Sequence, residues 1–495
     1  MEIFLGPPGT GKTTTLLGLV DEALAAGTRP DRIAFVSFTK KAASEAVQRA
    51  CERFGLNPGD FPHFRTLHSM AFRALGMKQS DVLGRDHFAD FSRIIGEKVT
   101  GSVTSVEGTA SAFNRGDRAL FLENLARVRG VSVIQQWRHD SLELQWLFVD
   151  RIARGLAAYK KKHALFDFSD MITMFNERGG APPLDLLIVD EAQDLSHEQW
   201  RMVYKLAEGA RRVVVAGDDD QAIFGWAGAD VEHFIGLPGS VTVLGQSYRV
   251  PKAVQGVAAG VIDRVSYRRP KEWAPRDEDG SVDFVKDVDH IDMSQGSWLA
   301  LARNNCFLTD AEATLRKNGL YYDRFGKPSI KQEHLSAIRA WEHLRSGGVV
   351  DADGVKSVLS SIKALRGLTG GVGEFDTYNR QQFINAFQVP VVDIWHEVLD
   401  AIPLLDRSYM VAALRRGEKI TKTPRIHLST IHGAKGGEAD NVVLFTDVAE
   451  RTYQSLKGKD KDEEARVFYV GVTRARKRLF VVLAHSPRSF SLARK

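Results

Sequence analysis

A glycine-rich loop near the start of the chain carries the clearest chemistry in the sequence. It fits the pattern G-x-x-x-x-G-K-[ST] at every fixed position, with the residues Gly6, Pro7, Pro8, Gly9, Thr10, Gly11, Lys12 and Thr13. An apolar stretch precedes it and a helix-like stretch follows, which is the setting in which such a loop cradles phosphate. Backbone N–H groups and the partial positive charge of a helix N-terminus both favour an anion there. We expect Lys12 to reach the β- and γ-phosphates of a nucleoside triphosphate and the Thr13 hydroxyl to coordinate Mg²⁺.

Two adjacent carboxylates, Asp190 and Glu191, supply the second half of a hydrolytic site. They follow the apolar run 184–189, which predicts a strand that delivers them to its carboxyl end, where ligands bind in open α/β sheets. Asp190 is then placed to hold Mg²⁺ through water, and Glu191 to orient and deprotonate the attacking water. Taken alone, the pair could be an exposed acidic turn. Beside the phosphate loop, hydrolysis is the better interpretation.

A third apolar run, 212–216, is followed by Gly217, three aspartates and Gln221, and two aromatic residues come next at Phe224 and Trp226. A polar cluster at a strand end can sense the γ-phosphate. The aromatic rings could stack on nucleic-acid bases, an interaction worth roughly 1–3 kcal/mol per base, or they could belong to the hydrophobic core. The residues by themselves leave both interpretations open.

The elements that must position these groups alternate between strand and helix. Strands and helices are expected in turn at Glu2–Leu5, Thr13–Ala26, Ile33–Phe38 and Lys40–Phe54. The pattern returns near the end of the chain, with a strand at 441–445, a helix at 463–470 and a strand at 479–483. Alternation of this kind predicts an α/β fold with two doubly wound parallel sheets. Residues 76–164 and 326–424 break the rhythm and predict two mainly helical insertions.

The bulk composition excludes few classes of protein. The 495 residues are 43% hydrophobic and 26% charged, which is typical of a globular chain of three or four compact units. No run of about 18 apolar residues is present, so we expect no membrane span, and the first residues do not resemble a signal peptide. Cys51 and Cys306 lie far apart in the sequence and predict two free thiols. The net charge of +5 says little about nucleic acid, and the basic cluster 159–163 could attract phosphate or form a solvated helix face.

Beyond these segments, the chain resembles the UvrD/Rep-type helicases of superfamily one. The resemblance rests on motifs that occur in the family's order from residue 1 to about 485, namely the phosphate loop and the segments 34–43, 65–69, 166–172, 188–194, 217–226, 246–249, 429–438 and 468–475. It implies two RecA-like motor domains with two mainly helical insertions. The first motor domain, 1A, would comprise residues 1–75 and 165–247, with insertion 1B at 76–164. The second, 2A, would comprise 248–325 and 425–495, with a reduced insertion 2B at 326–424.

The resemblance also implies roles for individual residues. Gln221 would link the state of the γ-phosphate to the DNA site, and Tyr248 would stack on the nucleotide base. Arg249 and Arg474 would act as arginine fingers, a task that suits an always-charged, bidentate guanidinium. The rest of the nucleotide set would include Thr14 after the phosphate loop and Glu438 at the ribose. The strand-contacting set would be Phe38, Thr39, His68, Phe224, Trp226 and His432.

The activity implied is that of an ATP-dependent DNA helicase that uses ATP and Mg²⁺, moves 3′→5′ on single-stranded DNA and unwinds duplexes. Its partners would be single-stranded DNA, duplex junctions and replication or repair proteins, with no membrane. Its place would be the cytoplasm of a bacterial or phage-infected cell, in association with the nucleoid. Two alternatives stay open: a translocase that strips proteins from a strand and needs a partner to unwind, and a nucleotide switch that binds without moving.

Several positions depart from the family's pattern. Thr14 and Ala227 stand where relatives usually carry arginine, Lys40 replaces a common asparagine, and Gly437 replaces a common leucine. These changes affect the expected strength of binding to the DNA strand and the coupling between ATP hydrolysis and DNA binding. The segment with an adenine-reading glutamine that precedes the loop in relatives is not seen here, which bears on the preference for ATP over other nucleoside triphosphates.

Overall fold

The computed structural model describes residues 1–37, 40–101, 114–140, 144–368, 372–373, 375–458 and 460–492. The chain divides into two compact units. The first unit comprises residues 1–282, 448–478 and 488–495, and the second comprises 283–447 and 479–487. No described helix is long and apolar enough to cross a membrane. Phe38 and Thr39, two of the predicted strand contacts, lie outside the described residues.

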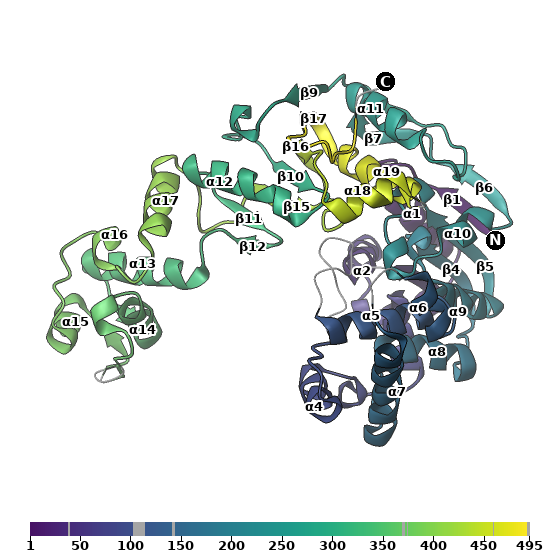
Figure 1. Cartoon of the computed structure of the whole chain (residues 1–495), viewed down its shortest axis with the longest axis horizontal. Coiled ribbons are helices and arrows are strands. Elements are labelled where there is room, and N and C mark those ends of the chain that lie inside the picture. Colours follow the sequence, from purple (N-terminus) through teal and green to yellow (C-terminus); the bar gives the residue numbers. More distant parts are fainter. Residues whose placement is uncertain are drawn as a thin grey trace. The chain divides into compact units, whose positions relative to one another are not determined.

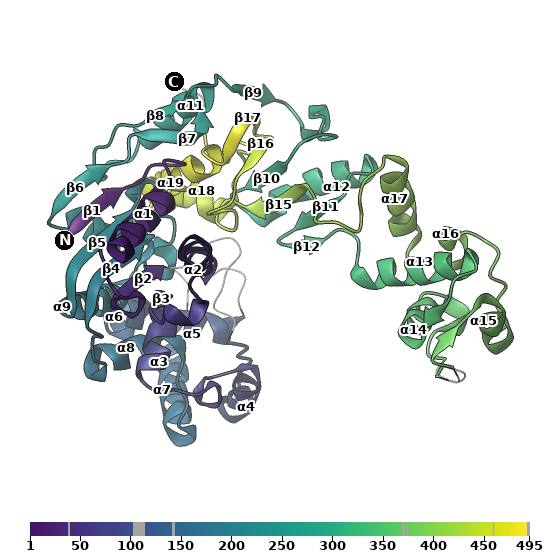
Figure 2. The same cartoon turned by 180° about the vertical axis from the view of Figure 1, so that it is seen from behind.

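The first unit is built on a six-stranded parallel sheet whose strand order is β3-β2-β4-β5-β1-β6. Figure 2 shows this order from β6 at one edge to β3 at the other. The strands are β1 (Glu2–Leu5), β2 (Ile33–Ser37), β3 (Phe64–Arg65), β4 (Leu184–Asp190), β5 (Ala210–Gly217) and β6 (Ser240–Val243). β2 and β4 are runs of β-branched and apolar residues that are buried along nearly their whole length, as expected for strands covered on both faces.

Helices cover both faces of this sheet, so the first unit is doubly wound. One apolar cluster joins α1 (Lys12–Ala25) and α2 (Lys40–Phe54) to residues of β2, β4 and β5. A second cluster joins the opposite set of strand residues to four further helices. These are α3 (Leu67–Ala74), α8 (Phe168–Arg178), α9 (His197–Glu208) and α10 (Val231–Gly236).

The segment predicted as the first helical insertion is helical and has an apolar core of its own. Its helices lie side by side (Figure 1) and are α4 (Arg85–Ile95), α5 (Arg115–Val128), α6 (Val133–His139) and α7 (Trp146–His163). The basic cluster 159–163 is not simply a phosphate-attracting face. Lys160 is buried and donates to Asp167 and Asp170, while the Tyr159 hydroxyl donates to Asp90.

The remainder of the first unit follows β6 and returns near the end of the chain. It contains β7 (Gln246–Pro251) paired with β8 (Ala274–Arg276). It also contains α11 (Lys252–Ile262), α18 (Glu450–Lys457) and α19 (Lys461–Val472), and α19 packs against both α11 and α18. The predicted helix at 463–470 is therefore confirmed and extends by two residues at each end.

The second unit contains a seven-stranded sheet of order β12-β11-β15-β10-β16-β17-β9. Neighbours from β11 to β16 pair in parallel, and β12 pairs antiparallel with β11. The strands are β9 (Ser281–Val285), β10 (Trp298–Ala302), β11 (Tyr322–Arg324), β12 (Lys327–Pro328), β15 (Ile426–Thr430), β16 (Ala439–Phe445) and β17 (Ala475–Val482), and the helix α12 (Thr309–Lys317) precedes β11.

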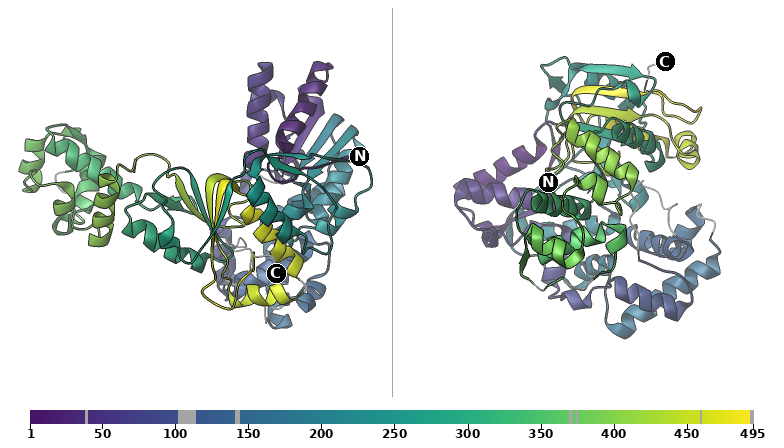
Figure 3. Two further views of the ribbon diagram at one scale, coloured as in Figure 1. Left: turned by 90° about the horizontal axis from the view of Figure 1, so that it is seen from above. Right: turned by 90° about the vertical axis from the view of Figure 1, so that its left-hand side faces the viewer.

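The predicted second insertion is mainly helical, as expected, and also holds one short antiparallel pair, β13 (Val350–Asp351) and β14 (Thr377–Tyr378). Its helices are α13 (Gln332–Arg345), α14 (Ala352–Ser360), α15 (Arg380–Phe387), α16 (Trp395–Val398) and α17 (Leu404–Arg415). In the left panel of Figure 3 these green helices gather apart from the strands of the second unit. The predicted fold class is confirmed, whereas the exact bounds of four domains remain a prediction.

Candidate functional site

The phosphate loop takes the conformation that its glycines were expected to allow. Gly9 and Gly11 have φ angles of +72° and +76°, in the left-handed region that favours glycine. The backbone N–H and the hydroxyl of Thr10 both donate to the Pro7 carbonyl, at 3.2 and 2.8 Å. Gly6 N–H donates to the Gly217 carbonyl at the end of β5. The loop is thereby held between β1 and the N-terminus of α1, which begins at Lys12.

Lys12 lies between the two predicted catalytic carboxylates. Its Nζ is 3.1 Å from Asp190 Oδ1 and 2.6 Å from Glu191 Oε1. Burial alone would lower the pKa of Lys12, but the two carboxylates overcome that effect and raise it. Burial raises the pKa of Asp190, although Lys12 opposes the shift. We call Lys12, Asp190 and Glu191 the loop cluster.

Glu191 sits in an unusual backbone conformation directly after β4. Its φ of +54° and ψ of +38° are left-handed values, which cost a non-glycine residue of order 1 kcal/mol and persist only where neighbours impose them. The backbone N–H of Glu191 donates to Asp190 Oδ1 at 2.8 Å, and Gln193 Nε2 donates to Glu191 Oε2 at 2.6 Å. The turn therefore directs the two consecutive carboxylates differently: Asp190 is buried and Glu191 is 30% exposed.

The residues beside the loop suit a magnesium ion. Asp190 offers a buried carboxylate that already accepts a cationic ammonium group at 3.1 Å, and Thr13 offers a hydroxyl in the first turn of α1. Hydroxyl and carboxylate oxygens are the hard ligands that Mg²⁺ prefers beside phosphate. Thr14 is exposed on the same turn. The donor set is therefore compatible with the predicted metal residues.

A continuous hydrogen-bonded path joins Glu191 to Arg474. Gln193 donates to Glu191 and accepts, through its Oε1, from the Asp218 backbone N–H at 3.0 Å. Asp218 Oδ2 accepts from Gln221 Nε2 at 2.6 Å, and Gln221 Oε1 accepts from Arg474 Nη2 at 2.7 Å. The side chains span the ends of β4 and β5 and Arg474, two residues beyond the end of α19. The structure thus brings three predicted residues, Glu191, Gln221 and Arg474, into one network.

The segment that carries Tyr248 and Arg249 lies directly on the phosphate loop. Tyr248 N–H donates to the Gly9 carbonyl at 2.8 Å, and the Ser247 hydroxyl donates to the Pro8 carbonyl at 2.7 Å. A Cβ at Gly9 would collide with the Cβ of Arg249, so only glycine permits this approach. The Tyr248 ring is 72% exposed and lies near Gly11. An exposed ring beside the loop is available to a nucleotide base.

His68 and Phe224 line one pocket of about 890 Å³ within the first unit, together with Thr66 and Phe168. The His68 and Phe168 rings meet edge to face at 5.7 Å between centroids. Burial lowers the pKa of His68 to about 4, so the ring is uncharged near neutral pH. A contact of His68 with a nucleic acid would therefore use ring packing or a neutral hydrogen bond rather than positive charge.

Trp226 belongs to the apolar core that the helical insertion forms. Its ring stacks on Phe121 of α5 at 6.2 Å between centroids with an interplanar angle of 16°. Its backbone N–H donates to Glu463 Oε1 at 3.2 Å. For Trp226, the structure therefore favours packing in the core over an exposed base-stacking position.

Two predicted residues belong to the second unit, where they follow β15. His432 is buried, and Glu438 is exposed at the end of the same motif. Because the phosphate loop is in the first unit, the predicted contacts of Glu438 with the ribose and of His432 with the strand remain predictions.

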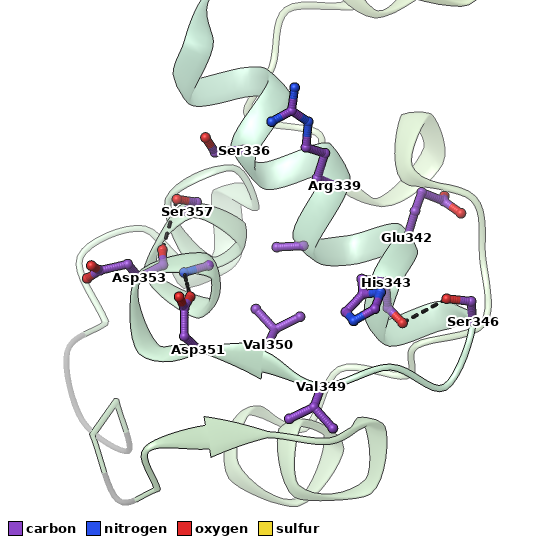
Figure 4. Close-up of a pocket in the computed structure, with 12 residues that line it drawn as sticks. Ser336, Arg339, Glu342, His343, Ser346, Val349, Val350, Asp351, Asp353 and Ser357 are labelled. Carbon is purple, nitrogen blue, oxygen red and sulfur yellow. Dashed lines mark hydrogen bonds between the residues drawn. The ribbon is translucent and has the colours of Figure 1, made fainter. Parts of the chain in front are cut away.

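A pocket of about 830 Å³ lies in the helical part of the second unit, between α13, β13 and α14 (Figure 4). Its rim is polar, with Arg339, Glu342 and His343 from α13 and Asp353 from α14. None of the residues that line it belongs to the motifs identified in the sequence. The chemistry of the molecule is therefore concentrated at the strand ends rather than in this pocket.

Comparison with known proteins assigns the family. Residues 3–240 match the model described as the UvrD/REP helicase N-terminal domain, and residues 376–486 match the UvrD-like helicase C-terminal domain. The probable DNA helicase II homolog of Rickettsia conorii is 22% identical, over 99% of this chain and 91% of that protein. The probable DNA helicase of Mycoplasma pneumoniae is 26% identical, over 96% of this chain and 79% of that protein. The ATP-dependent DNA helicase PcrA of Staphylococcus epidermidis is 26% identical, over 54% of this chain and 39% of that protein.

The chain therefore belongs to the UvrD/Rep-type helicase family, with two RecA-like parallel-sheet regions. It is an ATP-dependent DNA helicase. The family assignment that the ordered motifs suggested is confirmed.

Two contributors to the site were not singled out from the sequence. Gln193 lies inside the 188–194 motif, and only the structure reveals that its amide bridges the ends of β4 and β5. Lys271 lies about 50 residues beyond the three aspartates that it contacts. No local spacing signals a contact over that separation.

Proposed function

We propose that this helicase uses Mg-ATP to move 3′→5′ along single-stranded DNA and to unwind duplexes at a junction. The observation that carries the proposal is the path from Glu191 to Arg474 through Gln221. In that path, the group proposed to activate water and an arginine proposed to bind the γ-phosphate are four hydrogen bonds apart. A change at the phosphate can therefore reach Gln221 and the residues that follow it.

The chemistry begins with an exchange of partners at Lys12. A bound triphosphate carries more negative charge than the two carboxylates, so Lys12 turns from Asp190 and Glu191 towards the β- and γ-phosphates. Glu191, released from Lys12, accepts a proton from water as the water oxygen bonds to the γ-phosphorus and the bond to the bridging oxygen breaks. Mg²⁺, held by Thr13 and Asp190, would neutralise charge on the phosphate oxygens when bound.

Arg474 provides the proposed switch. In the structure it donates to Gln221 at 2.7 Å. A γ-phosphate competes for the same guanidinium and, with Arg249, stabilises the transferring group. Binding then frees Gln221, and phosphate loss restores the original bond. This gives the two states different contacts, as any ligand-driven shift requires.

Gln221 is also close in the sequence to residues proposed to contact DNA. Phe224 follows it by three residues and lines the pocket shared with His68, and Trp226 comes two residues later. A change in the hold on Gln221 can therefore alter how this segment meets a strand. Single-stranded DNA, duplex junctions and replication or repair proteins are the proposed partners, in bacterial or phage-infected cytoplasm.

Unwinding of tailed duplexes tests the proposal. With Mg-ATP, the protein should separate a duplex that has a 3′ single-stranded tail and leave a 5′-tailed duplex intact, and omission of Mg²⁺ should stop the reaction. Strand-stimulated hydrolysis without unwinding would favour a translocase that needs a partner. Hydrolysis that DNA does not affect would favour a nucleotide switch that does not move.

A further inference from the structure

We propose that Lys271 is a positioning residue for the γ-phosphate sensor, acting through Asp218 on Gln221 and so on Arg474. The proposal rests on the function proposed above and names a residue of the same site. It concerns the segment 268–271, which follows α11 and leads into β8.

Lys271 is inserted among three consecutive carboxylates at the end of β5. Its side chain is fully buried, and its Nζ lies 3.2 Å from both Asp218 Oδ1 and Asp220 Oδ2 and also pairs with Asp219. These carboxylates form the one described group of acidic, histidine or cysteine residues with ligand atoms close enough for a metal ion. Because the ammonium group of Lys271 already occupies their centre, the cluster has its cation from within the chain.

Neighbours of Lys271 fix the same aspartates from the other side. The Arg268 guanidinium pairs with both oxygens of Asp220, at 2.8 and 2.6 Å. The Arg269 backbone N–H donates to Asp219 Oδ2 at 2.8 Å, while its side chain donates to the carbonyls of Ile235 and Leu237. Segment 268–271 is therefore tied to the end of β5 by charge-assisted bonds whose geometry is specific. We call Lys271, Arg268 and the three aspartates the sensor cluster.

Asp218 connects this cluster to the proposed chemistry because its two oxygens have different partners. Oδ1 faces Lys271 at 3.2 Å, and Oδ2 accepts from Gln221 Nε2 at 2.6 Å. With its NH₂ group held by Asp218, Gln221 must direct its carbonyl oxygen away from the carboxylate. That oxygen accepts from Arg474 at 2.7 Å. Lys271 and the Asp220 backbone N–H, which donates to Asp218 Oδ1 at 3.2 Å, thus orient the carboxylate. The carboxylate orients the Gln221 amide, and the amide oxygen accepts from the arginine.

Charge makes this orientation depend on Lys271. Burial, together with the charges of Asp219 and Asp220, raises the pKa of Asp218 to about 6, although Lys271 opposes the shift. Tyr469 of α19 is fully buried beside the same group, and burial raises the pKa of its hydroxyl. Without the ammonium group, the pKa of Asp218 would rise further. The protonated carboxyl group would then hold Gln221 less firmly in one orientation.

The test removes Lys271 while keeping the charge balanced. Lys271→Met leaves buried aspartates unneutralised, so it is combined with Asp219→Asn, and Asp219→Asn alone is the reference. Lys252→Met, which removes an exposed ion pair with Asp279, is the surface control. Thermal unfolding, and kcat and KM for ATP with saturating single-stranded DNA, are measured for each protein.

We expect the double variant to remain folded, with kcat about 30-fold or more below that of the Asp219→Asn reference and KM for ATP within about threefold. Adding Gln221→Ala should lower kcat by no more than a further threefold or so, because residues that act along one path are not additive. A folded double variant with the kcat of its reference, or with fully additive losses, overturns the proposal.

A second pair of variants decides the matter if the double variant does not fold. Asp218→Asn and Asp219→Asn each remove one charge with little change of shape, but only Asp218 joins Lys271 to Gln221. A lower kcat for Asp218→Asn than for Asp219→Asn supports the proposal, and equal values overturn it. Absence of DNA-stimulated hydrolysis in the unaltered protein would instead contradict the proposed function, so the two failures are distinguishable.

Discussion

Two lysines stand among carboxylates at the ends of the neighbouring strands β4 and β5, and they differ in burial. In the loop cluster, Lys12 is 12% exposed and Glu191 is 30% exposed, although Asp190 is 1% exposed. In the sensor cluster, Lys271 and its aspartate partners are at most 1% exposed. Burial would lower the pKa of both lysines, and in both clusters the carboxylates overcome it and raise the pKa.

The difference shows how one kind of ion pair can serve two purposes. A partly open pair can exchange a carboxylate for a phosphate, because solvent and ligand reach it. A closed pair cannot exchange, and removal of one partner leaves an uncompensated buried charge that costs about 3–5 kcal/mol. We infer that the loop cluster changes partners during each catalytic cycle. The sensor cluster remains fixed and holds Asp218, the hydrogen-bond partner of Gln221, in place.

Replacement of Lys12 tests the loop cluster, and its effect on ATP hydrolysis is expected to be the largest of the four. We predict that Lys12→Ala lowers ATP hydrolysis to background because the phosphates lose their cationic partner. The melting temperature should fall as well, because Asp190 is 1% exposed and loses its cation, but by less than for Lys271→Met, because Glu191, the second partner of Lys12, is 30% exposed. Steady-state hydrolysis and thermal unfolding measure both. Retained turnover would refute the phosphate-loop role, and a loss of stability as large as that of Lys271→Met would remove the contrast with Lys271.

Arg474 tests the link between the clusters. Arg474→Ala should lower kcat by about 10³-fold, the scale of an arginine that stabilises a transferring phosphoryl group, with a much smaller effect on nucleotide affinity. Because Arg474 is 1% exposed and also donates to the Val470 carbonyl, stability should fall as well. Arg474→Lys serves as the charge-preserving control. Equal losses in kcat and affinity would argue for a binding role alone.

Trp226 tests whether the segment that follows the sensor cluster couples hydrolysis to DNA binding. Trp226→Ala should lower the stimulation of hydrolysis by DNA about tenfold, because loss of its packing on Phe121 loosens the segment that carries Phe224, and leave basal hydrolysis in place. It should also destabilise the first unit by about 2 kcal/mol, since the ring packs on Phe121. Phe121→Leu alters that packing partner and is the matched control. An unchanged response to DNA would restrict Trp226 to the core.

His68 gives the smallest effect near neutral pH, since it is partly buried without the opposite charge that both lysines have. Its folded pKa of about 4 lies below its ordinary 6.5, so the unfolded chain binds more protons between these values and stability falls as pH decreases through that window. The contribution is on the order of 3 kcal/mol at pH 4 and close to zero above pH 7. His68→Phe should lose this part of the pH dependence in denaturant titrations. A pH dependence identical to that of the unaltered protein would contradict the burial of a neutral ring.

Local sequence patterns predicted the elements and the phosphate loop, because both depend on neighbouring residues. β1 and α2 have the predicted bounds, and the other predicted strands, β2, β4, β5, β16 and β17, differ only at their ends. β3 and β6 to β15 were not among the predicted elements. Contacts between distant residues were beyond such patterns. The stacking of Trp226 on Phe121, the burial of Lys160 and the insertion of Lys271 among Asp218–Asp220 all depend on tertiary packing that no local spacing encodes.

The coupling of hydrolysis to a strand is the central claim, and one measurement tests it most directly. Steady-state ATP hydrolysis should be measured with and without saturating single-stranded DNA. We predict that DNA raises kcat at least about tenfold and that Lys12→Ala abolishes hydrolysis in both conditions. Turnover that is the same with and without DNA would contradict the account, because the hydrogen bonds around Gln221 would then not couple hydrolysis to strand binding.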